Sequence, residues 1–251
     1  MKSKLLKIAA AVSAAALIAG GIYFLFYDDL AQKISYEKLK PFMPDITVLN
    51  VSPTEQIEED EKKELNEQVQ ELNQSYDDSI GWIYIPDTNI DYPIMQSGDN
   101  DYYAHRATDG SYLYAGSLFM DYRCSSDFSD FNSVIYGHNM GNGTMFADIP
   151  NYENEEFFMN HSFGWLTTDD NLRLIDFFAV ARTADTSGLY LADPTFEKWD
   201  LQLRNCASIY KEIGISEEDN LITLSTCTSA EGNSRTILVG KIIDNREDDA
   251  E

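Results

Sequence analysis

A cysteine and an arginine near the end of the chain have types and a spacing that suit nucleophilic chemistry. Residues 221–227 (LITLSTC) end in Cys227, and residues 236–243 (TILVGKII) begin directly after Arg235. Both runs are rich in the aliphatic and β-branched residues that favour strands, and the glycine and asparagine between them favour a loop. If these strands pair antiparallel, Cys227 and Arg235 lie at the same rim. A fixed positive charge there would favour the thiolate, which is the nucleophilic form of cysteine.

The same pattern also has a structural interpretation, because most free cysteines are small buried core residues. The two-residue period of a strand places Thr223, Ser225 and Cys227 on one face, which is the more polar one. The pattern alone leaves both interpretations open.

A reactive thiol near neutral pH needs a proton acceptor or a cation beside it, and the chain has three histidines. His161 lies among aromatic residues and is interpreted as structural. His105 precedes an arginine, whose charge would oppose its protonation. His138 follows the apolar residues 134–136 and opens a loop rich in glycine and asparagine, residues 137–143, where catalytic groups are typically found. We therefore predict that His138 is the partner of the thiol.

The N-terminal segment predicts a membrane anchor. Residues 8–27 contain no charge, and a helix of that length spans roughly 30 Å, the thickness of a bilayer core. Three lysines precede the run, so the positive-inside rule predicts a cytoplasmic N-terminus over 1–7 and a single-pass transmembrane signal anchor over 8–27. The rest of the chain would then be extracellular, at the cell membrane. A cleaved signal peptide is the alternative, but the run is longer and bulkier than such peptides require.

Composition and charge exclude several classes of function. With 251 residues, 43% hydrophobic and 12% aromatic, the chain is globular and not a disordered acidic tail. Its net charge is −25, with every acidic residue after position 27, so it repels nucleic acid and anionic polymers. The three cysteines have neither zinc-site nor redox-pair spacing. The sequence does not decide whether Cys124 and Cys206 form a disulfide.

The remaining chain predicts a stalk followed by a β-rich domain with helices. Residues 28–54 contain three prolines and predict an extracellular stalk. Leu65, Val69 and Leu72 form a thin apolar stripe that predicts a helix, packed on the flank of the domain or, alternatively, against a coiled-coil partner. Many short strands separated by turns predict a barrel or a sandwich. The predicted elements are strands near 81–86, 92–95, 117–122, 133–136 and 172–182, helices over 55–78, 146–159 and 194–213, and an acidic tail over 245–251.

Four segments together resemble the class B sortases, cell-surface cysteine transpeptidases of Gram-positive bacteria. They are WIYIP at 82–86, GSLFMDYR at 116–123, NSVIYGHNM at 132–140, and TLSTC at 223–227 with the following arginine. The resemblance covers about residues 55 to 244, which would be the catalytic domain. It implies a mostly β fold with flanking helices (α+β), namely an eight-stranded β-barrel with an N-terminal helix and a long helix inserted before the last strands.

The resemblance also implies roles for particular residues. Cys227 would be the nucleophile, His138 the acid and base, and Arg235 the group that holds substrate and stabilises the oxyanion. No cofactor or metal is implied. Class B members often carry an acidic residue just after the nucleophile, where this chain has threonine and serine, so no carboxylate is assigned to the catalytic set. Substrate would be bound by Ser225, Asn100 and Tyr190.

The predicted function is that of a membrane-anchored cysteine transpeptidase. It would cleave exported proteins after a threonine in a C-terminal sorting signal and pass the thioacyl intermediate to an amine of a peptidoglycan precursor or a pilin. A cysteine endopeptidase resolved by water, and a catalytically silent surface binding module, are the alternatives. The sequence leaves open the sorting motif, the amine, the oligomeric state, and the choice between wall anchoring, display of haem-uptake proteins and pilus assembly.

Overall fold

The computed structural model of the chain describes residues 2–49, 57–227 and 233–244. Its contacts divide it into two compact units, Met1–Pro41 and Phe42–Glu251. The predicted acidic tail, the end of the predicted stalk over 50–54 and most of the loop after Cys227 lie outside the described residues.

The first unit is formed mainly by one helix, α1 (Lys2–Leu39), and the boundary between the units falls within η1 (Lys40–Phe42). The apolar run 8–27 lies in α1, but the helix continues past it through several charged residues to Leu39. In the described ranges, no helix combines the length and apolarity that a bilayer crossing requires. The predicted transmembrane anchor, and the membrane localisation that rested on it, are therefore wrong. Residues 28–39, predicted as irregular stalk, are helical because the prolines begin only at Pro41.

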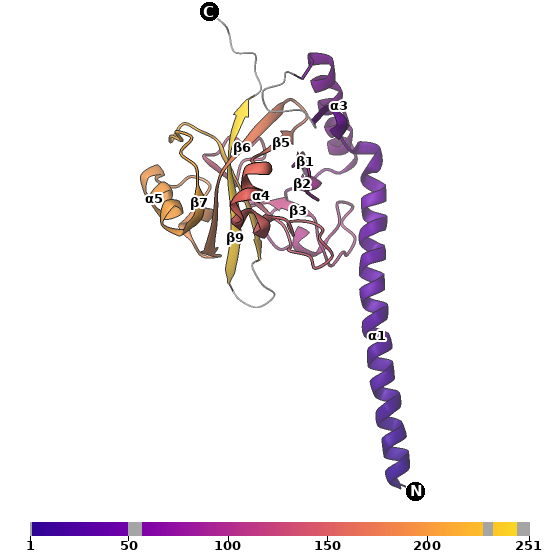
Figure 1. The fold of residues 1–251 in the computed structure, drawn as a ribbon. Coiled ribbons are helices and arrows are strands. Elements are labelled where there is room, and N and C mark those ends of the chain that lie inside the picture. The colour runs from indigo at the N-terminus through magenta and orange to yellow at the C-terminus, as the bar shows by residue number, and fades with distance from the viewer. Residues whose placement is uncertain (1, 50–56, 228–232, 245–251) are drawn as a thin grey trace, which may run out of the picture. The chain divides into compact units, whose positions relative to one another are not determined.

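The described residues of the second unit form nine strands and several helices (Figure 1). The helices are α2 (Ile46–Leu49), α3 (Glu59–Ser75), α4 (Glu155–Asn160) and α5 (Phe196–Cys206), with short 3-10 helices η2 (Tyr103–His105), η3 (Ile149–Glu153) and η4 (Gly188–Tyr190). The strands are β1 (Ser79–Tyr84), β2 (Asp91–Met95), β3 (Leu118–Met120), β4 (Asn132–Tyr136), β5 (Phe163–Thr167), β6 (Leu172–Ala184), β7 (Ala207–Tyr210), β8 (Leu221–Cys227) and β9 (Ser234–Asp244).

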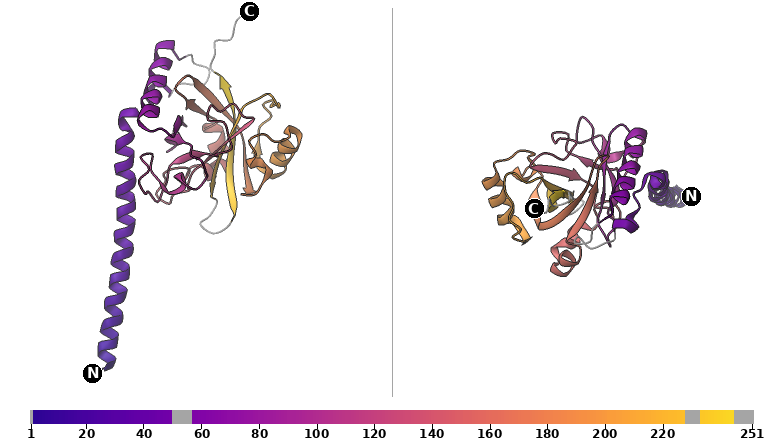
Figure 2. Two further views of the ribbon diagram at one scale, coloured as in Figure 1. Left: turned by 180° about the vertical axis from the view of Figure 1, so that it is seen from behind. Right: turned by 90° about the horizontal axis from the view of Figure 1, so that it is seen from above.

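The strands close into a barrel. Their order is β5-β1-β2-β3-β4-β8-β9-β6-β7, and a further pairing between β5 and β6 closes the first eight of them. Eight strands therefore form a closed ring, and β7 pairs with β6 outside it. Seen from above, the strands surround a common interior (Figure 2). The predicted eight-stranded barrel with flanking helices is confirmed.

The core lies where apolar strand residues converge. All eight strands of the ring contribute fully buried apolar side chains, among them Ile83, Ile94, Val134, Leu224 and Leu238. This burial supplies the main driving force for closing the ring, because apolar area removed from water stabilises the fold roughly in proportion.

Helix α3 covers part of the barrel as its apolar stripe predicts. Leu65, Val69 and Leu72 are all buried, and α3 contacts β1, β5 and β6. The helix begins with a capping box, in which the Glu58 backbone N–H donates to the Glu61 side chain at 3.3 Å. Three acidic residues in its first turn complement the positive end of the helix dipole.

The helix before the last strands is shorter than the predicted 194–213. Helix α5 ends at Cys206, and the next residues form β7, in which Tyr210 pairs with Ala179 and Ile209 with Val180. Residues 207–210 form a strand and not a continuation of the helix, because β6 supplies hydrogen-bond partners for their backbone groups. Both elements lie together at one side of the barrel (Figure 1).

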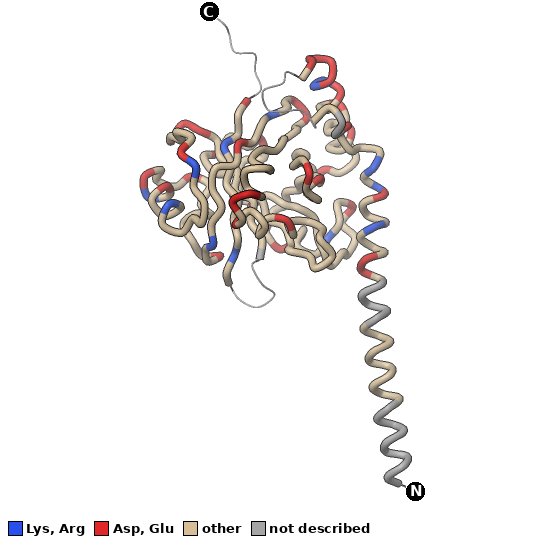
Figure 3. The backbone as a smooth tube through the Cα atoms, in the orientation of Figure 1, with Lys and Arg blue, Asp and Glu red and all other residues tan. Residues whose placement is uncertain are grey.

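Acidic residues are spread over several loops and helices of the second unit (Figure 3). This distribution fits the solvated acidic surface that the net charge of −25 indicates.

Candidate active site

Strand register brings the three predicted catalytic positions to one rim of the barrel. Strands β4 and β8 are parallel, with Tyr136 opposite Ser225. His138 and Cys227 each lie two residues beyond this pair, so both follow the same end of two neighbouring strands. Strands β8 and β9 are antiparallel, with Cys227 directly opposite Arg235. The backbone alone therefore places these three positions side by side.

A cavity of about 290 Å³ opens at this rim. It contains five of the six predicted site residues, His138, Arg235, Ser225, Asn100 and Tyr190. The sixth, Cys227, contributes its described backbone to the rim, while its side chain lies outside the described part of the chain. The other lining residues are Ala104, Phe119, Tyr136, Gly137, Asp185 and Thr226.

The position of His138 depends on the glycine before it. A Cβ at Gly137 would come within 2.5 Å of Leu118 and 2.6 Å of Phe146, so no larger residue fits without movement of the core. The Gly137 N–H donates to the Ser225 carbonyl at 3.1 Å, which extends the β4–β8 pairing toward the cavity. The close packing and the hydrogen bond of Gly137 thus hold the start of the loop that carries His138 against β8.

One ring nitrogen of His138 forms a hydrogen bond within the protein. Its Nε2 lies 2.8 Å from the carbonyl oxygen of Ala104. A carbonyl only accepts, so Nε2 carries the hydrogen and donates, which leaves Nδ1 to exchange a proton with a reactant. The His138 ring also stacks on His105, with ring centres 5.2 Å apart, and His105 in turn stacks on Tyr114.

The surroundings of His138 favour its neutral form. Burial lowers the pKa of His138 from its ordinary 6.5, and the charges of His105 and Arg235 lower it further, against the opposing effect of the hydrogen bond to Ala104. Before substrate binds, the ring is therefore a base at neutral pH.

Arg235 lies at the rim with its side chain largely covered. The side chain is 25% exposed, and one of its guanidinium nitrogens lies 3.6 Å from a carboxylate oxygen of Asp185. Long-range pairing with β6 places Arg235 opposite Thr183, just before that aspartate. The guanidinium therefore lies at the cavity with one side facing a carboxylate.

The predicted substrate-binding residues Ser225 and Tyr190 contact each other. Their hydroxyl oxygens are 2.9 Å apart, and Tyr190 is 5% exposed. The turn that carries Tyr190 is held by Asn132, whose amide donates to the carbonyls of Leu189 and Leu191 at 2.9 and 3.0 Å. The buried Asn132 side chain thus holds Tyr190 beside β8, the strand that ends in Cys227.

The other two cysteines are free thiols in environments that disfavour the thiolate. Burial raises the pKa of the Cys124 thiol to about 11, and its sulfur donates to the Asn132 carbonyl at 3.6 Å. Burial also raises the pKa of Cys206. Neither thiol therefore has the character of a nucleophile, and no disulfide joins them.

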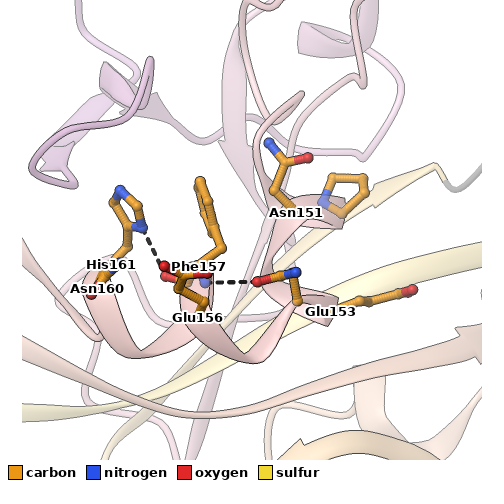
Figure 4. A pocket seen from close by; sticks show the side chains of 8 residues that line it. Asn151, Glu153, Glu156, Phe157, Asn160 and His161 are labelled. Carbon is orange, nitrogen blue, oxygen red and sulfur yellow. Dashed lines mark hydrogen bonds between the residues drawn. The ribbon is translucent and has the colours of Figure 1, made fainter.

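A second hollow, of about 710 Å³, lies over η3 and α4. Figure 4 shows its lining, in which His161 donates from Nδ1 to the Phe157 carbonyl at 2.7 Å and stacks on the Phe157 ring. Glu153, in the same lining, pairs with Arg182. These contacts are those expected of a structural histidine, and no cysteine belongs to this lining.

Sequence reasoning missed several residues around the cavity. Tyr136 and Asp185 line it, and Asp121 lies behind it bonded to two lining residues. Tyr136 could have been noticed as the aromatic residue at the end of β4, two positions before His138. Asp185 carried no comparable signal, because only the pairing of β6 with β9 brings it to Arg235.

Comparison with known proteins identifies close relatives. A sortase domain family matches residues 83–243. Sortase B of Listeria monocytogenes is 38% identical over 189 residues, covering 72% of this chain and 76% of that protein. The crystal structure of Clostridium perfringens sortase B is 30% identical with a TM-score of 0.65, covering 70% of this chain and 99% of that one. A Streptococcus pyogenes class B sortase, described as involved in pilus biogenesis, is 28% identical with a TM-score of 0.64, covering 69% and 96%.

Proposed function

The chain belongs to the class B sortases and is a cysteine transpeptidase, and from this premise we propose that it cleaves proteins after a threonine in a C-terminal sorting signal and transfers them to an amine. Residues 55–244 form the catalytic domain in this proposal. The observation that carries it is the strand register, which lines up Tyr136 with Ser225 and Cys227 with Arg235 at the mouth of the cavity.

The first chemical step is attack by Cys227 on the carbonyl carbon of the threonine. Neutral His138 accepts the thiol proton at Nδ1, because Nε2 is held by Ala104. A bond forms between sulfur and carbon, and the carbonyl electron pair moves onto oxygen. The Cys–His pair titrates as a coupled unit, so neither group has an individual pKa in this step.

Arg235 stabilises the charge that develops on this oxygen. Its guanidinium lies at the rim, opposite Cys227 across the β8–β9 pair. A planar fork of donors can hold an oxyanion with a geometry that a point charge lacks. Collapse of the tetrahedral intermediate breaks the C–N bond, and His138 gives its proton to the leaving amine.

The second step resolves the thioester. An amine from a peptidoglycan precursor or a pilin attacks the acyl carbon and loses a proton to His138, and the Cys227 thiolate leaves. Hydrolysis of the same thioester by water would give an endopeptidase. Product yields with and without an added amine distinguish the two outcomes.

The test of this proposal is trapping of the acyl-enzyme with threonine-containing pentapeptides. The wild-type protein should accumulate a thioester adduct that maps to Cys227, and the Cys227→Ala variant should form none. Cys206→Ala is the matched control and should react as the wild type does. An adduct on Cys124 or Cys206, or equal labelling of the Cys227→Ala variant, would refute the assignment.

A further inference from the structure

A buried carboxylate that the proposed reaction does not use lies behind the cavity. Asp121 directly follows β3, and its side chain is only 1% exposed. Its two oxygens accept from the Arg123 guanidinium at 2.8 and 2.6 Å, from the Tyr136 hydroxyl at 2.9 Å and from the Asn100 amide at 3.0 Å. These donors come from separate segments of the chain.

Asp121 is ionised at neutral pH. Burial alone would raise the pKa of its carboxyl, but hydrogen bonds from Arg123, Tyr136 and Asn100 outweigh burial and hold the pKa below its ordinary value. Burial and the neighbouring carboxylate raise the pKa of Tyr136. Tyr136 therefore stays protonated and can only donate toward Asp121.

Two of these donors belong to the cavity wall. Asn100 and Tyr136 both line the cavity. The Tyr136 ring stacks on Tyr190 with ring centres 6.0 Å apart, and Arg123 donates to the Tyr190 carbonyl at 3.4 Å. Through these contacts one carboxylate supports three lining residues.

The carboxylate also sets which atoms face the cavity. An ionised carboxylate only accepts, so it forces the amide nitrogen of Asn100 toward itself, while the amide oxygen accepts from the Tyr122 N–H at 3.0 Å. One amide orientation is thereby selected, and one N–H of Asn100 remains for a ligand. The Tyr136 oxygen, with its hydrogen directed at Asp121, is left as an acceptor.

We propose that Asp121 is a positioning residue that fixes the hydrogen-bonding pattern of the cavity wall for a peptide backbone. An amide N–H and a hydroxyl acceptor match a peptide carbonyl and a peptide N–H. This inference rests on the proposed function, since it assigns the wall to the acyl side of the substrate. The alternative is a purely structural ion pair with Arg123, which would stabilise the fold without affecting substrate.

The substitution that separates these alternatives is Asp121→Asn. An amide has nearly the same shape, but its nitrogen cannot accept a hydrogen bond, so one of the two positions that now accept from Arg123, Tyr136 and Asn100 loses its bonds. Asp200 provides the matched control, because it also accepts from a tyrosine hydroxyl, that of Tyr210 at 2.7 Å, and from an arginine, Arg204 at 2.8 Å. Asp200 lies on α5, and neither it nor its donors line the cavity.

Peptide binding is measured in the Cys227→Ala background, where no reaction can follow, and turnover is measured in the native background. Asp121→Asn should raise the Kd and the KM of the peptide by about 10- to 100-fold, with a smaller change in kcat. Alkylation of Cys227 by a small thiol reagent should stay unchanged. Asp200→Asn should leave the Kd, the KM and the alkylation rate unchanged.

The inference is overturned if Asp121→Asn binds peptide as tightly as Asp200→Asn while both variants are folded. If Asp121→Asn does not fold, Tyr136→Phe serves instead, since it keeps the ring and its stacking but loses the hydroxyl. A wild-type Kd in Tyr136→Phe would then overturn the inference. Failure of the proposed function is a separate result, namely a wild-type protein that binds peptide without forming an acyl-enzyme.

Discussion

Two regions of the second unit combine an aspartate, a tyrosine and an arginine in the same way. Behind the cavity, Asp121 accepts from Tyr136 and Arg123. On the α5–β7 side, Asp200 accepts from Tyr210 and Arg204. The donor sets are alike, but the Asp121 side chain is 1% exposed and that of Asp200 is 19% exposed.

The two clusters differ in what else their members contact. The Asp200 cluster is local, since Arg204 is one helical turn away and also pairs with the exposed Glu212. The Asp121 cluster joins distant segments and includes residues of the cavity wall. The same set of hydrogen bonds can thus stabilise the flank of the domain or position residues of a binding site. Which of the two it does depends on whether its members line the cavity.

The largest effect should follow from replacing an arginine at the rim. Arg235→Lys keeps a positive charge near Cys227 but loses the planar fork of donors, so kcat/KM should fall about 10²–10³-fold. Arg204→Lys, on the α5 side, should leave kcat/KM unchanged. Steady-state kinetics with a sorting peptide measure both. Arg235→Ala should lower kcat/KM at least as much, while the rate at which a thiol reagent alkylates Cys227 should change far less. Full activity of Arg235→Lys would show that Arg235 acts only as a charge.

A second difference should appear in stability. Asp121→Asn should lower the free energy of unfolding by about 2–3 kcal/mol at neutral pH, because buried bonds to a charged group are lost. Asp200→Asn should lower it less, since its cluster is more exposed. Urea titration followed by tryptophan fluorescence measures both.

The pH dependence of this difference has a definite sign. The folded-state pKa of Asp121 lies below its ordinary 3.8, so its contribution is fully present above that value and is lost as the pH falls below it. The stability gap between wild type and Asp121→Asn should therefore close in acid. A gap that stays constant below pH 3.8 would contradict the assignment of an ionised Asp121.

A smaller effect should follow from removing a tyrosine hydroxyl. Tyr190→Phe loses the bond to Ser225, worth about 1 kcal/mol, and should raise the KM of the peptide about fivefold. Tyr210→Phe loses the bond to Asp200 and should leave KM unchanged. Equal KM values in the two variants would remove Tyr190 from the substrate site.

The smallest effect concerns the titration of His138, followed by NMR in the Cys227→Ala background. Its midpoint should lie below 6.5 because of burial, and Arg235→Gln should raise it by removing a nearby positive charge. Arg204→Gln, at the other cluster, should leave the midpoint in place. A midpoint above 6.5 would contradict the neutral resting state of His138.

Local patterns predicted the rim well. The hairpin around Cys227 and Arg235 follows from two adjacent runs of strand-forming residues, and the observed register pairs these two residues directly. His138 follows from a strand that ends in a glycine-containing loop. These features depend on neighbours in sequence, which is why sequence sufficed.

Contacts between distant segments could not be predicted in the same way. Asp121 contacts Asn100 and Tyr136 because β3 pairs with both β2 and β4 in the folded ring. The end of α5 was misjudged because β7 forms against β6, a partner well before it in sequence. Helical propensity over 194–213 cannot reveal this, since tertiary pairing overrides it.

The strand outside the ring has a consequence for behaviour at high concentration. Among the described strands, β7 alone has a single neighbour, so its outer edge could add a strand from another molecule. That edge is only four residues long, from Ala207 to Tyr210, about 13 Å, and is shorter than a typical strand. Closure of the other eight strands leaves no longer edge among them. The folded domain therefore offers little template for intermolecular sheet growth, and β-sheet aggregation should require opening of the barrel first.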